Sequence, residues 1–392
     1  MAKLRLDAVA FKRESCDSDC FLKDIVAYSS NSVVFLFDAF GIHLAYAPRE
    51  LRISRLSLPF LRFQNPKIYY YFYPLSFCFD NFIIFMLFFW LSLRCRVDTI
   101  IMETYSAAFV GILRKCNLVK KMIYITSDWF VGNKYKRGIW THVGSNKIFP
   151  ILDYYACRFA DITLNLLDFV AHARFDFWGK KITNKEFLFH QHLEIKRKHS
   201  DARKRNNKIV HIGEVRNDSG LDIVIKSLPL IREKVDVSLK VIGVTNTLHL
   251  YLKALARAYN VEKFVDLRGF IPRGNYLDEL SDCVCGTNLL TSEGTFTSRS
   301  IPSKVVDYLQ YLIPVAVSEN VGPIAAIIRE NNLGQIISPA EPDFIQAYFK
   351  IYENQEGIRS NIVAFINASP YTDLKSLFAG CMPAILTKEG DL

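Results

Sequence analysis

The sequence lacks the features that mark several classes of protein. Its longest apolar run, Phe82–Leu91, falls well short of the roughly 20 residues that a helix needs to cross a bilayer. No continuous apolar segment occurs near the N-terminus, so we expect no secretory signal peptide. The nine cysteines are scattered and form no Cys-x-x-Cys pair, which favours free thiols in a reducing cytoplasm over a disulfide framework.

The motifs of two large enzyme classes are also missing. There is no Gly-x-Ser-x-Gly, the turn that presents the nucleophile of many serine hydrolases. There is no Gly-x-x-x-x-Gly-Lys-Ser/Thr, the phosphate loop of P-loop NTPases. His190 and His192 have no carboxylate or cysteine at ligand spacing, and Cys283 and Cys285 alternate along an expected strand. Both pairs are better interpreted as structural residues than as metal ligands, so we expect no metal.

The composition nevertheless suits a well-folded chain. Half of the 392 residues are hydrophobic and 22% are charged, which supplies real cores and argues against wholesale disorder. The length predicts two domains of roughly 150–200 residues. The formal net charge of +10 favours an anionic partner, such as nucleotide phosphates, an anionic membrane face or nucleic acid. A basic surface without a specific partner is the alternative.

Strand-like and helix-like segments alternate through the first half of the chain. A helix is expected over Phe82–Leu93, either buried or lying on a membrane surface, and Lys67–Tyr73 is aromatic and β-prone. The other expected elements are Ser32–Asp38, Val97–Met102, Tyr105–Cys116, Lys121–Thr126, Ile151–Phe159 and Asp161–Leu166. This alternation predicts a parallel sheet that is covered on both faces.

A charged stretch follows this half. Residues 194–207 hold many Lys and Arg and few apolar residues, which is typical of an interdomain linker. A nucleic-acid contact or a localisation signal is the alternative. We predict an N-terminal domain over residues 1–193 and a C-terminal domain over residues 208–350, joined by this linker. Residues 351–392 are expected to form helices that pack back on the N-terminal domain.

The second half repeats the alternation more regularly. Strands are expected over Lys208–Ile212, Ser238–Ile242 and Cys283–Asn288, and the first two are followed directly by Gly213 and Gly243. Expected helices include Leu221–Ile231, Leu248–Tyr259, Lys304–Tyr311 and Ile324–Glu330. The pattern predicts a doubly wound domain, whose ligands bind beyond the carboxyl ends of the strands.

Residues 284–317 are the most informative segment. A loop of small residues precedes an expected helix there, and free backbone N–H groups at such a place suit phosphate. Lys304 adds a positive charge where the helix dipole disfavours one unless an anion binds. Asp307 follows one turn later, where a carboxylate can accept hydrogen bonds from sugar hydroxyls. The expected nucleotide-sugar site therefore includes Ser292, Glu293, Gly294, Thr295, Ser303, Lys304 and Asp307.

The order of these elements resembles the retaining glycosyltransferases of the GT-B fold, in particular family 4, the glycosyl transferases group 1. The resemblance covers about residues 208–340 and is carried by His211-Ile212-Gly213-Glu214-Val215-Arg216, Val241-Ile242-Gly243, Leu267-Arg268-Gly269 and Pro302-Ser303-Lys304. The family's ribose-binding acidic residue lies seven positions before a proline, as Asp307 does before Pro314. The resemblance implies an α/β chain of two Rossmann-like, doubly wound domains facing across a cleft. The N-terminal domain would be on the acceptor side, and the C-terminal domain would bind the nucleotide sugar. The resemblance also implies that Gly213, Arg216 and Gly243 bind substrate.

Two features depart from the family pattern. The family's first glutamate would fall at Arg299, eight positions before Asp307, whereas Glu293 lies fourteen before it. A loop insertion is needed to bring Glu293 into place. The Gly-Gly loop that helps the family bind acceptor is absent from the N-terminal half. Phosphate charge is then met by Arg216, Lys304 and Arg299.

The N-terminal half carries a weaker resemblance over Val97–Ile101, Ile123–Asp128 and Ala160–Thr163. It implies that Asp128 lies near the transferred sugar and is catalytic together with Lys304. An N-cap for the following turn is the alternative for Asp128.

The resemblance implies a retaining, hexosyltransferase-like enzyme. It would move a sugar from a nucleotide-diphosphate sugar to a saccharide or a lipid-linked acceptor, without a cofactor or metal and without a nucleic-acid partner. We expect a cytoplasmic protein that is peripheral on the membrane, because the Phe82–Leu93 segment and the positive charge suit an anionic lipid surface. Two alternatives stay open: a catalytically inactive GT-B protein that binds a saccharide or partner, and a GT-B sugar-nucleotide epimerase.

Overall fold

The computed structural model divides the chain into two compact units. Unit 1 includes Met1–His192, and unit 2 is Leu193–Ser369. Each unit is described by itself. The structure describes residues 4–13, 31–38, 41–47, 66–103, 106–126, 129, 131, 143–166, 168–183, 186–188, 193, 195–196, 207–213, 215–271, 276–280, 283–291 and 302–369.

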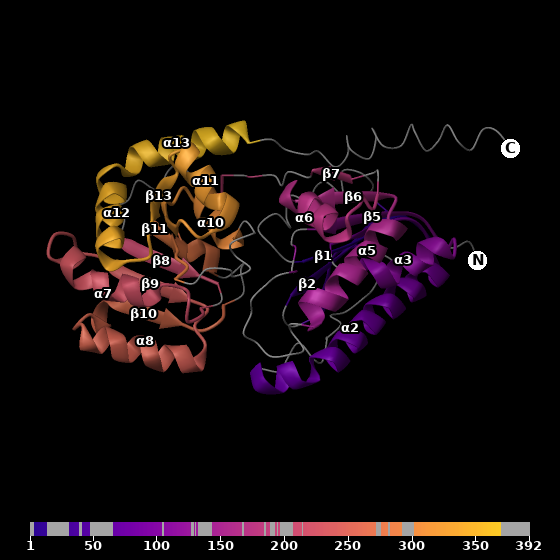
Figure 1. Ribbon diagram of the computed structural model, residues 1–392, viewed down its shortest axis with the longest axis horizontal. Coiled ribbons are helices and arrows are strands. Elements are labelled where there is room, and N and C mark those ends of the chain that lie inside the picture. The colour runs from indigo at the N-terminus through magenta and orange to yellow at the C-terminus, as the bar shows by residue number, and fades with distance from the viewer. Residues whose placement is uncertain are drawn as a thin grey trace. The chain divides into compact units, whose positions relative to one another are not determined.

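Unit 1 is built on a seven-stranded sheet in the order β3-β2-β1-β4-β5-β6-β7 (Figure 1). Neighbouring strands run parallel, except that β2 and β3 pair antiparallel. Successive residues such as Val9 and Ala10 belong to the cores on opposite faces of this sheet, so both faces are buried. The strands are β1 (Leu4–Arg13), β2 (Ser32–Asp38), β3 (Gly41–Tyr46), β4 (Cys95–Met102), β5 (Val119–Thr126), β6 (Ile162–Asn165) and β7 (Glu186–Leu188).

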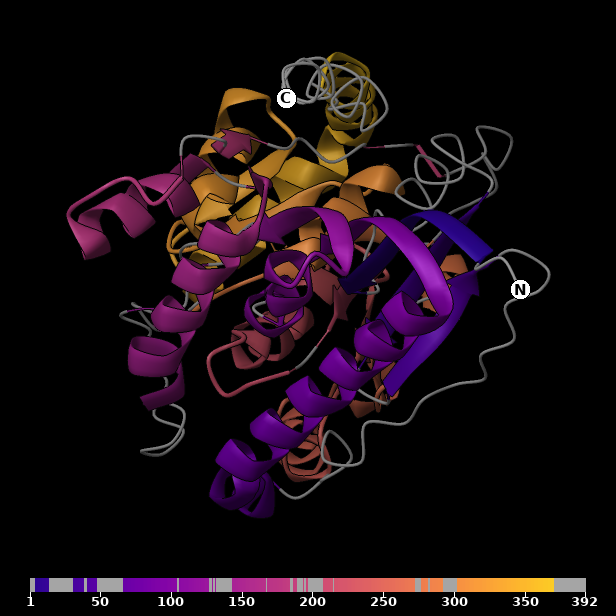
Figure 2. The same ribbon diagram turned by 90° about the vertical axis from the view of Figure 1, so that its right-hand side faces the viewer.

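Three helices cover one face of this sheet: α2 (Pro66–Arg94), α3 (Ala107–Lys115) and α5 (Phe149–Phe159). α3 packs against both α2 and α5, and Figure 2 shows α2, in purple, along the side of unit 1 that is turned to the viewer. The short η1 (Gly144–Ile148) leads into α5, and α6 (Asp168–Trp178) packs near β6. No helix in the described ranges combines the length and the apolar character needed to cross a membrane.

α2 is longer than the sequence predicts. The expected helix Phe82–Leu93 lies inside it, but Lys67–Tyr73 is helical as well, so the β-prone interpretation of that segment is wrong. Ile84, Phe88 and Leu91 recur at helical spacing and are buried against the sheet. This tertiary packing outweighs the strand preference of the neighbouring aromatic residues, because strand propensity depends strongly on context.

A buried ionic cluster joins the elements at one end of unit 1. The Arg174 guanidinium on α6 makes two hydrogen bonds to the Asp153 carboxylate on α5, at 2.7 and 3.0 Å. It also bonds to Asn165 and Glu186, on β6 and β7, and the Tyr124 hydroxyl donates to Asp153 at 3.0 Å. Arg174 is 1% exposed and Asp153 is fully buried. Burial lowers the pKa of Arg174, but the charge and hydrogen bond of Asp153, together with Cys157 and Tyr124, outweigh burial and raise that pKa above its usual value.

Unit 2 holds a six-stranded, fully parallel sheet in the order β10-β9-β8-β11-β12-β13 (Figure 1). This is the strand order of a doubly wound nucleotide-binding domain, and it reverses between β8 and β11. The strands are β8 (Lys208–Ile212), β9 (Ser238–Ile242), β10 (Val265–Arg268), β11 (Cys283–Asn288), β12 (Val315–Ser318) and β13 (Gly334–Ile337). The helices are α7 (Leu221–Arg232), α8 (Asn246–Ala258), η2 (Glu262–Phe264), η3 (Leu277–Leu280), α10 (Ser303–Gln310), α11 (Gly322–Glu330), α12 (Glu341–Glu353) and α13 (Gln355–Ala368).

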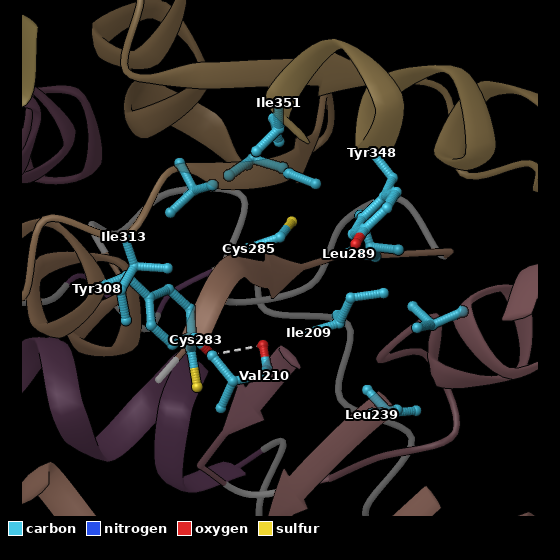
Figure 3. Packing of buried hydrophobic residues seen from close by; sticks show 14 of the residues in the cluster. Ile209, Val210, Leu239, Cys283, Cys285, Leu289, Tyr308, Ile313, Tyr348 and Ile351 are labelled. Carbon is cyan, nitrogen blue, oxygen red and sulfur yellow. Dashed lines mark hydrogen bonds between the residues drawn. The ribbon is translucent and has the colours of Figure 1, made fainter. Parts of the chain in front are cut away.

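Four expected strands occur with the predicted bounds: Ser32–Asp38, Lys208–Ile212, Ser238–Ile242 and Cys283–Asn288. In the last of these, both cysteines are buried, as expected. A register shift between Cys283 and Cys285 marks a bulge in β11. Cys285 therefore lies on the side of Tyr348 and Ile351, and Cys283 on the side of Tyr308 (Figure 3).

The boundaries of unit 2 differ from the predicted domain limits. Ile351, Ile358, Ile362 and Ile366 belong to the hydrophobic core of unit 2. Residues 351–369 are thus part of this unit, whereas the prediction ended the C-terminal domain at residue 350. The expected packing of residues 351–392 on the N-terminal domain stays a prediction, and residues 370–392 lie outside the described ranges.

Most of the predicted linker is also outside the described ranges. Its described part packs on unit 2, because the Lys196 N–H donates to the Gln310 carbonyl at 2.9 Å and Ile195 contacts the core.

Candidate functional site

Two glycines end the strands next to the point where the strand order reverses. Gly213 follows β8 with φ +94° and Gly243 follows β9 with φ +107°, a range that disfavours a side chain. A Cβ on Gly243 would lie 2.2 Å from the Gly213 carbonyl oxygen. A Cβ on Gly213 would lie 3.4 Å from Lys304 Cε. The two turns therefore pack closely, and the Lys304 side chain lies against Gly213.

A chain of hydrogen bonds runs from Lys304 into the sheet. Lys304 Nζ lies 3.2 Å from His211 Nε2, and His211 Nδ1 lies 3.2 Å from Thr287 Oγ1. The Thr287 hydroxyl donates to the Val210 carbonyl at 3.2 Å. Because a lysine ammonium can only donate, His211 Nε2 accepts, and Nδ1 carries the hydrogen that Thr287 Oγ1 accepts. The donor and the acceptor of each of these hydrogen bonds are thereby defined, and the chain holds the Lys304 ammonium at the carboxyl end of β8.

His211 is neutral in this arrangement. Burial lowers the pKa of His211 well below its usual 6.5, and the positive charge of Lys304 lowers it further. A neutral imidazole can accept from Lys304, whereas a protonated one would repel it. His211 therefore positions the lysine without adding a charge of its own.

We expect His211 to make unit 2 less stable in acid. Below its ordinary pKa of 6.5, the unfolded chain binds a proton at this residue and the folded chain does not, so stability falls as the pH drops. The free energy of unfolding should decrease by about 1 kcal/mol per pH unit from this group alone. Chemical denaturation followed by circular dichroism between about pH 7.5 and pH 5 measures the slope.

The matched comparison uses His211→Gln and His249→Gln, which each remove one histidine. The wild type and His249→Gln should lose stability in acid with similar slopes, and His211→Gln should have a flatter profile. Equal slopes for His211→Gln and the wild type would contradict the neutral, buried imidazole.

Tyr308 links the helix that carries Lys304 to the same strand end. Its hydroxyl accepts the Ile212 N–H at 2.9 Å and lies 3.4 Å from the Val210 carbonyl (Figure 3). The ring is fully buried against Gly286, where a Cβ would lie 2.5 Å from a ring carbon. Lys304 and Tyr308 are four residues apart on α10, so one helix face meets β8 and β11.

Arg216 lies in the turn after β8, as expected, but it already has an acidic partner. Its Nε and Nη2 atoms lie 3.1 and 3.4 Å from the two carboxylate oxygens of Asp218. The Ser219 hydroxyl accepts the Arg216 N–H at 2.9 Å, and the Asp218 carbonyl accepts the Thr291 N–H at 3.1 Å. This turn is therefore tied to the chain that follows β11. A phosphate at Arg216 would have to share the guanidinium with Asp218.

Ser303 and Asp307 lie on α10 with Lys304. Ser303 is exposed in the first turn, whereas Asp307 is only 2% exposed. The Tyr276 hydroxyl donates to Asp307 Oδ2 at 3.3 Å. Asp307 is therefore a buried, hydrogen-bonded carboxylate rather than an open one, and its role at a ribose stays a prediction.

A buried donor also lies at the end of β11. Asn288 is 3% exposed, and among the described residues its side-chain nitrogen has no hydrogen-bond partner. Burying an amide hydrogen without a partner costs roughly 1–3 kcal/mol. The neighbouring strand end is satisfied, because the Ser318 hydroxyl accepts the Leu290 N–H at 2.8 Å. Asn288 is thus a candidate donor to a ligand at this edge.

Residues 193–381 match the family model described as glycosyl transferases group 1. Over these residues the chain belongs to the glycosyl transferases group 1. The family that the motifs around Gly213, Gly243 and Lys304 indicate is thereby confirmed. No curated protein sequence matches this group 1 chain.

Solved structures match nearly the whole of this chain, including the residues before the family match. HepE from Anabaena in complex with UDP is 12% identical with a TM-score of 0.63, and the match covers 97% of this chain and 100% of HepE. Sucrose-phosphate synthase from Thermosynechococcus elongatus is 11% identical, with a TM-score of 0.64 and coverage of 98% and 100%. WaaG, a glycosyltransferase involved in lipopolysaccharide biosynthesis, is 12% identical, with a TM-score of 0.59 and coverage of 95% and 99%. These likenesses confirm the GT-B fold with its two Rossmann-like domains.

The structure brings together some of the expected site residues of this glycosyltransferase. Gly213, Gly243 and Lys304 meet at one place, and Arg216 follows in the adjoining turn. Other predicted site residues lie outside the described ranges, namely Asp128, Ser292, Glu293, Gly294, Thr295 and Arg299. Their roles stay predictions.

Sequence reasoning missed His211, Thr287, Tyr308 and Asn288 as members of this site. The spacing of Lys304 and Tyr308 on one helix face was the available signal for Tyr308. His211 lies two residues before Gly213 and belongs to the motif quoted for the family resemblance, but the sequence assigned it no function. No sequence signal singled out Thr287 or Asn288.

Proposed function

We propose that this protein is a retaining hexosyltransferase that moves a sugar from a UDP-sugar to a lipid-linked saccharide acceptor. The observation that carries the proposal is the Lys304 ammonium, which lies against Gly213 and 3.2 Å from the neutral His211. This is the place where doubly wound sheets bind their ligands. UDP is the proposed nucleotide because structures of HepE hold UDP or UDP-glucose.

The proposed chemistry places charge on the diphosphate. The bond between the anomeric carbon and the UDP oxygen breaks, and the acceptor oxygen forms its bond on the same face of the sugar. The acceptor's proton passes to the departing phosphate oxygen. Lys304 and the N–H groups at the start of α10 stabilise that leaving group, since pre-aligned charges and dipoles act strongly where charge develops. We propose no metal or cofactor, because Lys304, Arg216 and Arg299 meet the phosphate charge.

The remaining candidate residues take the following proposed roles. Gly213 and Gly243 let the backbone approach the diphosphate. The loop over residues 292–295 and Ser303 contact the sugar and the phosphates. Asp307 binds the ribose, with Tyr276 fixing its carboxylate. Asp128, in unit 1, acts near the transferred sugar.

We further propose that the protein works in the cytoplasm on lipid-linked substrates. Among the described residues, the buried Cys157 and Cys285 form no disulfide, which suits a reducing compartment. The net charge of +10 suits anionic substrates and an anionic membrane face.

Calorimetric titration with UDP, UMP and uridine tests the donor site. UDP is expected to bind at least about tenfold more tightly than uridine, because charge-assisted contacts to the diphosphate supply most of the binding free energy. Radiolabelled UDP-glucose is then incubated with a lipid-linked saccharide fraction. Sugar should pass to the lipid fraction, UDP release should require that fraction, and EDTA should have no effect.

Each other outcome points to a different function. Binding of UDP-glucose without turnover would indicate a non-catalytic binding protein. Free product sugar released without any acceptor would indicate an epimerase. Equally weak binding of UDP and uridine in the calorimetric titration would overturn the proposed donor site.

A further inference from the structure

From Phe79 to Leu93, the outer side of α2 carries large apolar side chains, as does the side that faces the sheet. Ile84 and Phe88 are buried in the core of unit 1, whereas Phe82 is 57% exposed and Trp90 is 40% exposed. The exposed large side chains follow each other at intervals of three or four residues and form one stripe along the helix. A helix that is apolar all round is normally buried on every side. The stripe consists of Phe79, Phe82, Met86, Trp90 and Leu93.

The neighbouring helices extend this apolar surface. α3 packs against both α2 and α5, and all three cover the same face of the sheet. The outward positions of α3 and α5 hold further exposed apolar residues, Ile112, Ile151 and Tyr155, and Ile148 precedes α5. We call this set, together with the α2 stripe, the outer helical face of unit 1. Large apolar side chains that gather on one exposed surface often mark an interaction site.

The charges on the outer helical face all have one sign. The exposed charged residues of α2, α3, η1 and α5, among the side chains that the structure describes, are Arg94, Lys115, Lys147 and Arg158. None is an aspartate or a glutamate. Basic residues in a last helical turn complement the helix dipole, which accounts for Arg94, Lys115 and Arg158 but not for the missing acids. The face thus combines large apolar groups with positive charge, which suits an anionic apolar partner.

Trp90 and Arg94 form a pair that suits an interface between water and hydrocarbon. The Arg94 guanidinium lies 5.0 Å from the centre of the Trp90 ring. Tryptophan rings favour the headgroup level of a bilayer, and arginine keeps its charge in water while its carbon chain covers apolar surface. A second copy of the chain suits this face less well, because two copies face to face would bring like charges together.

We propose that the outer helical face of unit 1 docks on the surface of a bilayer that contains anionic lipids. The apolar stripe of α2 inserts at the headgroup boundary, and Arg94, Lys115, Lys147 and Arg158 meet the lipid phosphates. This inference deepens the proposed link to an anionic membrane face, on which it rests, by naming the surface that docks. Its test is separate from that of the donor site, because no part of the outer helical face belongs to that site.

Vesicle flotation of the full chain tests the proposal. The protein is mixed with vesicles of phosphatidylcholine alone, or of an equimolar mixture of phosphatidylcholine and phosphatidylglycerol. We expect binding to the anionic vesicles to be at least about tenfold stronger and to weaken with added salt. Tryptophan emission should shift to the blue on binding, and the Trp90→Phe variant should lose most of that shift.

Two double variants separate the apolar and the basic contributions. Phe82→Ser with Trp90→Ser should reduce binding to anionic vesicles at least about tenfold. Lys147→Glu with Arg158→Glu should remove the preference for phosphatidylglycerol, and it touches only exposed positions. The matched control is Leu250→Ser, a 72% exposed leucine on α8 of unit 2, which should bind like the wild type.

Three results would overturn the docking proposal. The first is no binding of the wild type to anionic vesicles. The second is unchanged binding by both double variants, whose thermal melts show that they are folded. The third is a dimer in sedimentation that Phe82→Ser with Trp90→Ser abolishes. UDP binding by the same samples reports on the donor site separately, so a failure there leaves the vesicle result standing.

Discussion

Replacing Lys304 by methionine is expected to lower kcat/KM for the UDP-sugar about 10²- to 10³-fold. The ammonium lies against Gly213 and 3.2 Å from His211 Nε2, and in the proposed mechanism it meets the diphosphate as charge develops there. The loss should fall mainly on kcat, because the lysine stabilises the departing UDP more than the bound donor. Steady-state kinetics of sugar transfer measure both constants.

A matched variant controls for the general loss of one positive charge. Lys350→Met on α12 removes an exposed lysine from the same unit, and it should leave kcat/KM within about twofold of the wild type. Lys304→Arg keeps the charge but not the compact ammonium that His211 holds, so it should retain partial activity. Lys304→Met activity equal to that of Lys350→Met would remove Lys304 from the catalytic machinery.

Replacing Arg174 by methionine is expected to destabilise unit 1 by about 3–5 kcal/mol. The guanidinium compensates the fully buried Asp153 and also bonds to Glu186. Without it, Asp153 stays buried next to the Tyr124 hydroxyl with no positive partner from Arg174. Denaturant unfolding measures the loss as a lower midpoint.

Tryptophan fluorescence reports this loss for unit 1 alone. The four tryptophans, at positions 90, 129, 140 and 178, all precede residue 193. Arg158→Met on α5 removes an exposed arginine and should change the midpoint little. Arg174→Lys keeps a charge but cannot make the paired contact to Asp153. Its unfolding midpoint should therefore lie between those of Arg174→Met and Arg158→Met. A midpoint for Arg174→Met that matches Arg158→Met would show that the cluster contributes no stability.

Continuous apolar, β-branched runs followed by glycine were enough to locate the strands Lys208–Ile212 and Ser238–Ile242 to the residue. Such runs match the strands of a parallel sheet, because both faces of those strands are buried and take apolar side chains. The strand Leu4–Arg13 was not predicted, although it lies in the interior of its sheet, between β2 and β4. Charged residues interrupt its ends, so its local pattern is less apolar than its position requires. The β-prone interpretation of Lys67–Tyr73 was wrong, because this segment is the start of the long helix α2. Strand propensity depends strongly on context, and it did not decide the local structure here.

In the candidate site, too, some residues could be predicted from the sequence and others could not. Gly213, Gly243 and Lys304 were recognisable because a left-handed turn and a helix start each need a particular residue type in a local pattern. The roles of His211 and Lys304 toward each other were not recognisable, since these residues are 93 positions apart in the chain.

By itself, the sequence determined the doubly wound pattern, the family and the glycines at the strand ends, because backbone geometry and hydrophobic periodicity are local properties. Only the tertiary structure decided that His211 is a neutral acceptor beneath Lys304. It also decided that Cys283 and Cys285 lie on opposite faces of β11, and that α2 leaves an apolar stripe exposed. Burial, charge proximity and register arise when distant segments pack together, and no local pattern encodes them.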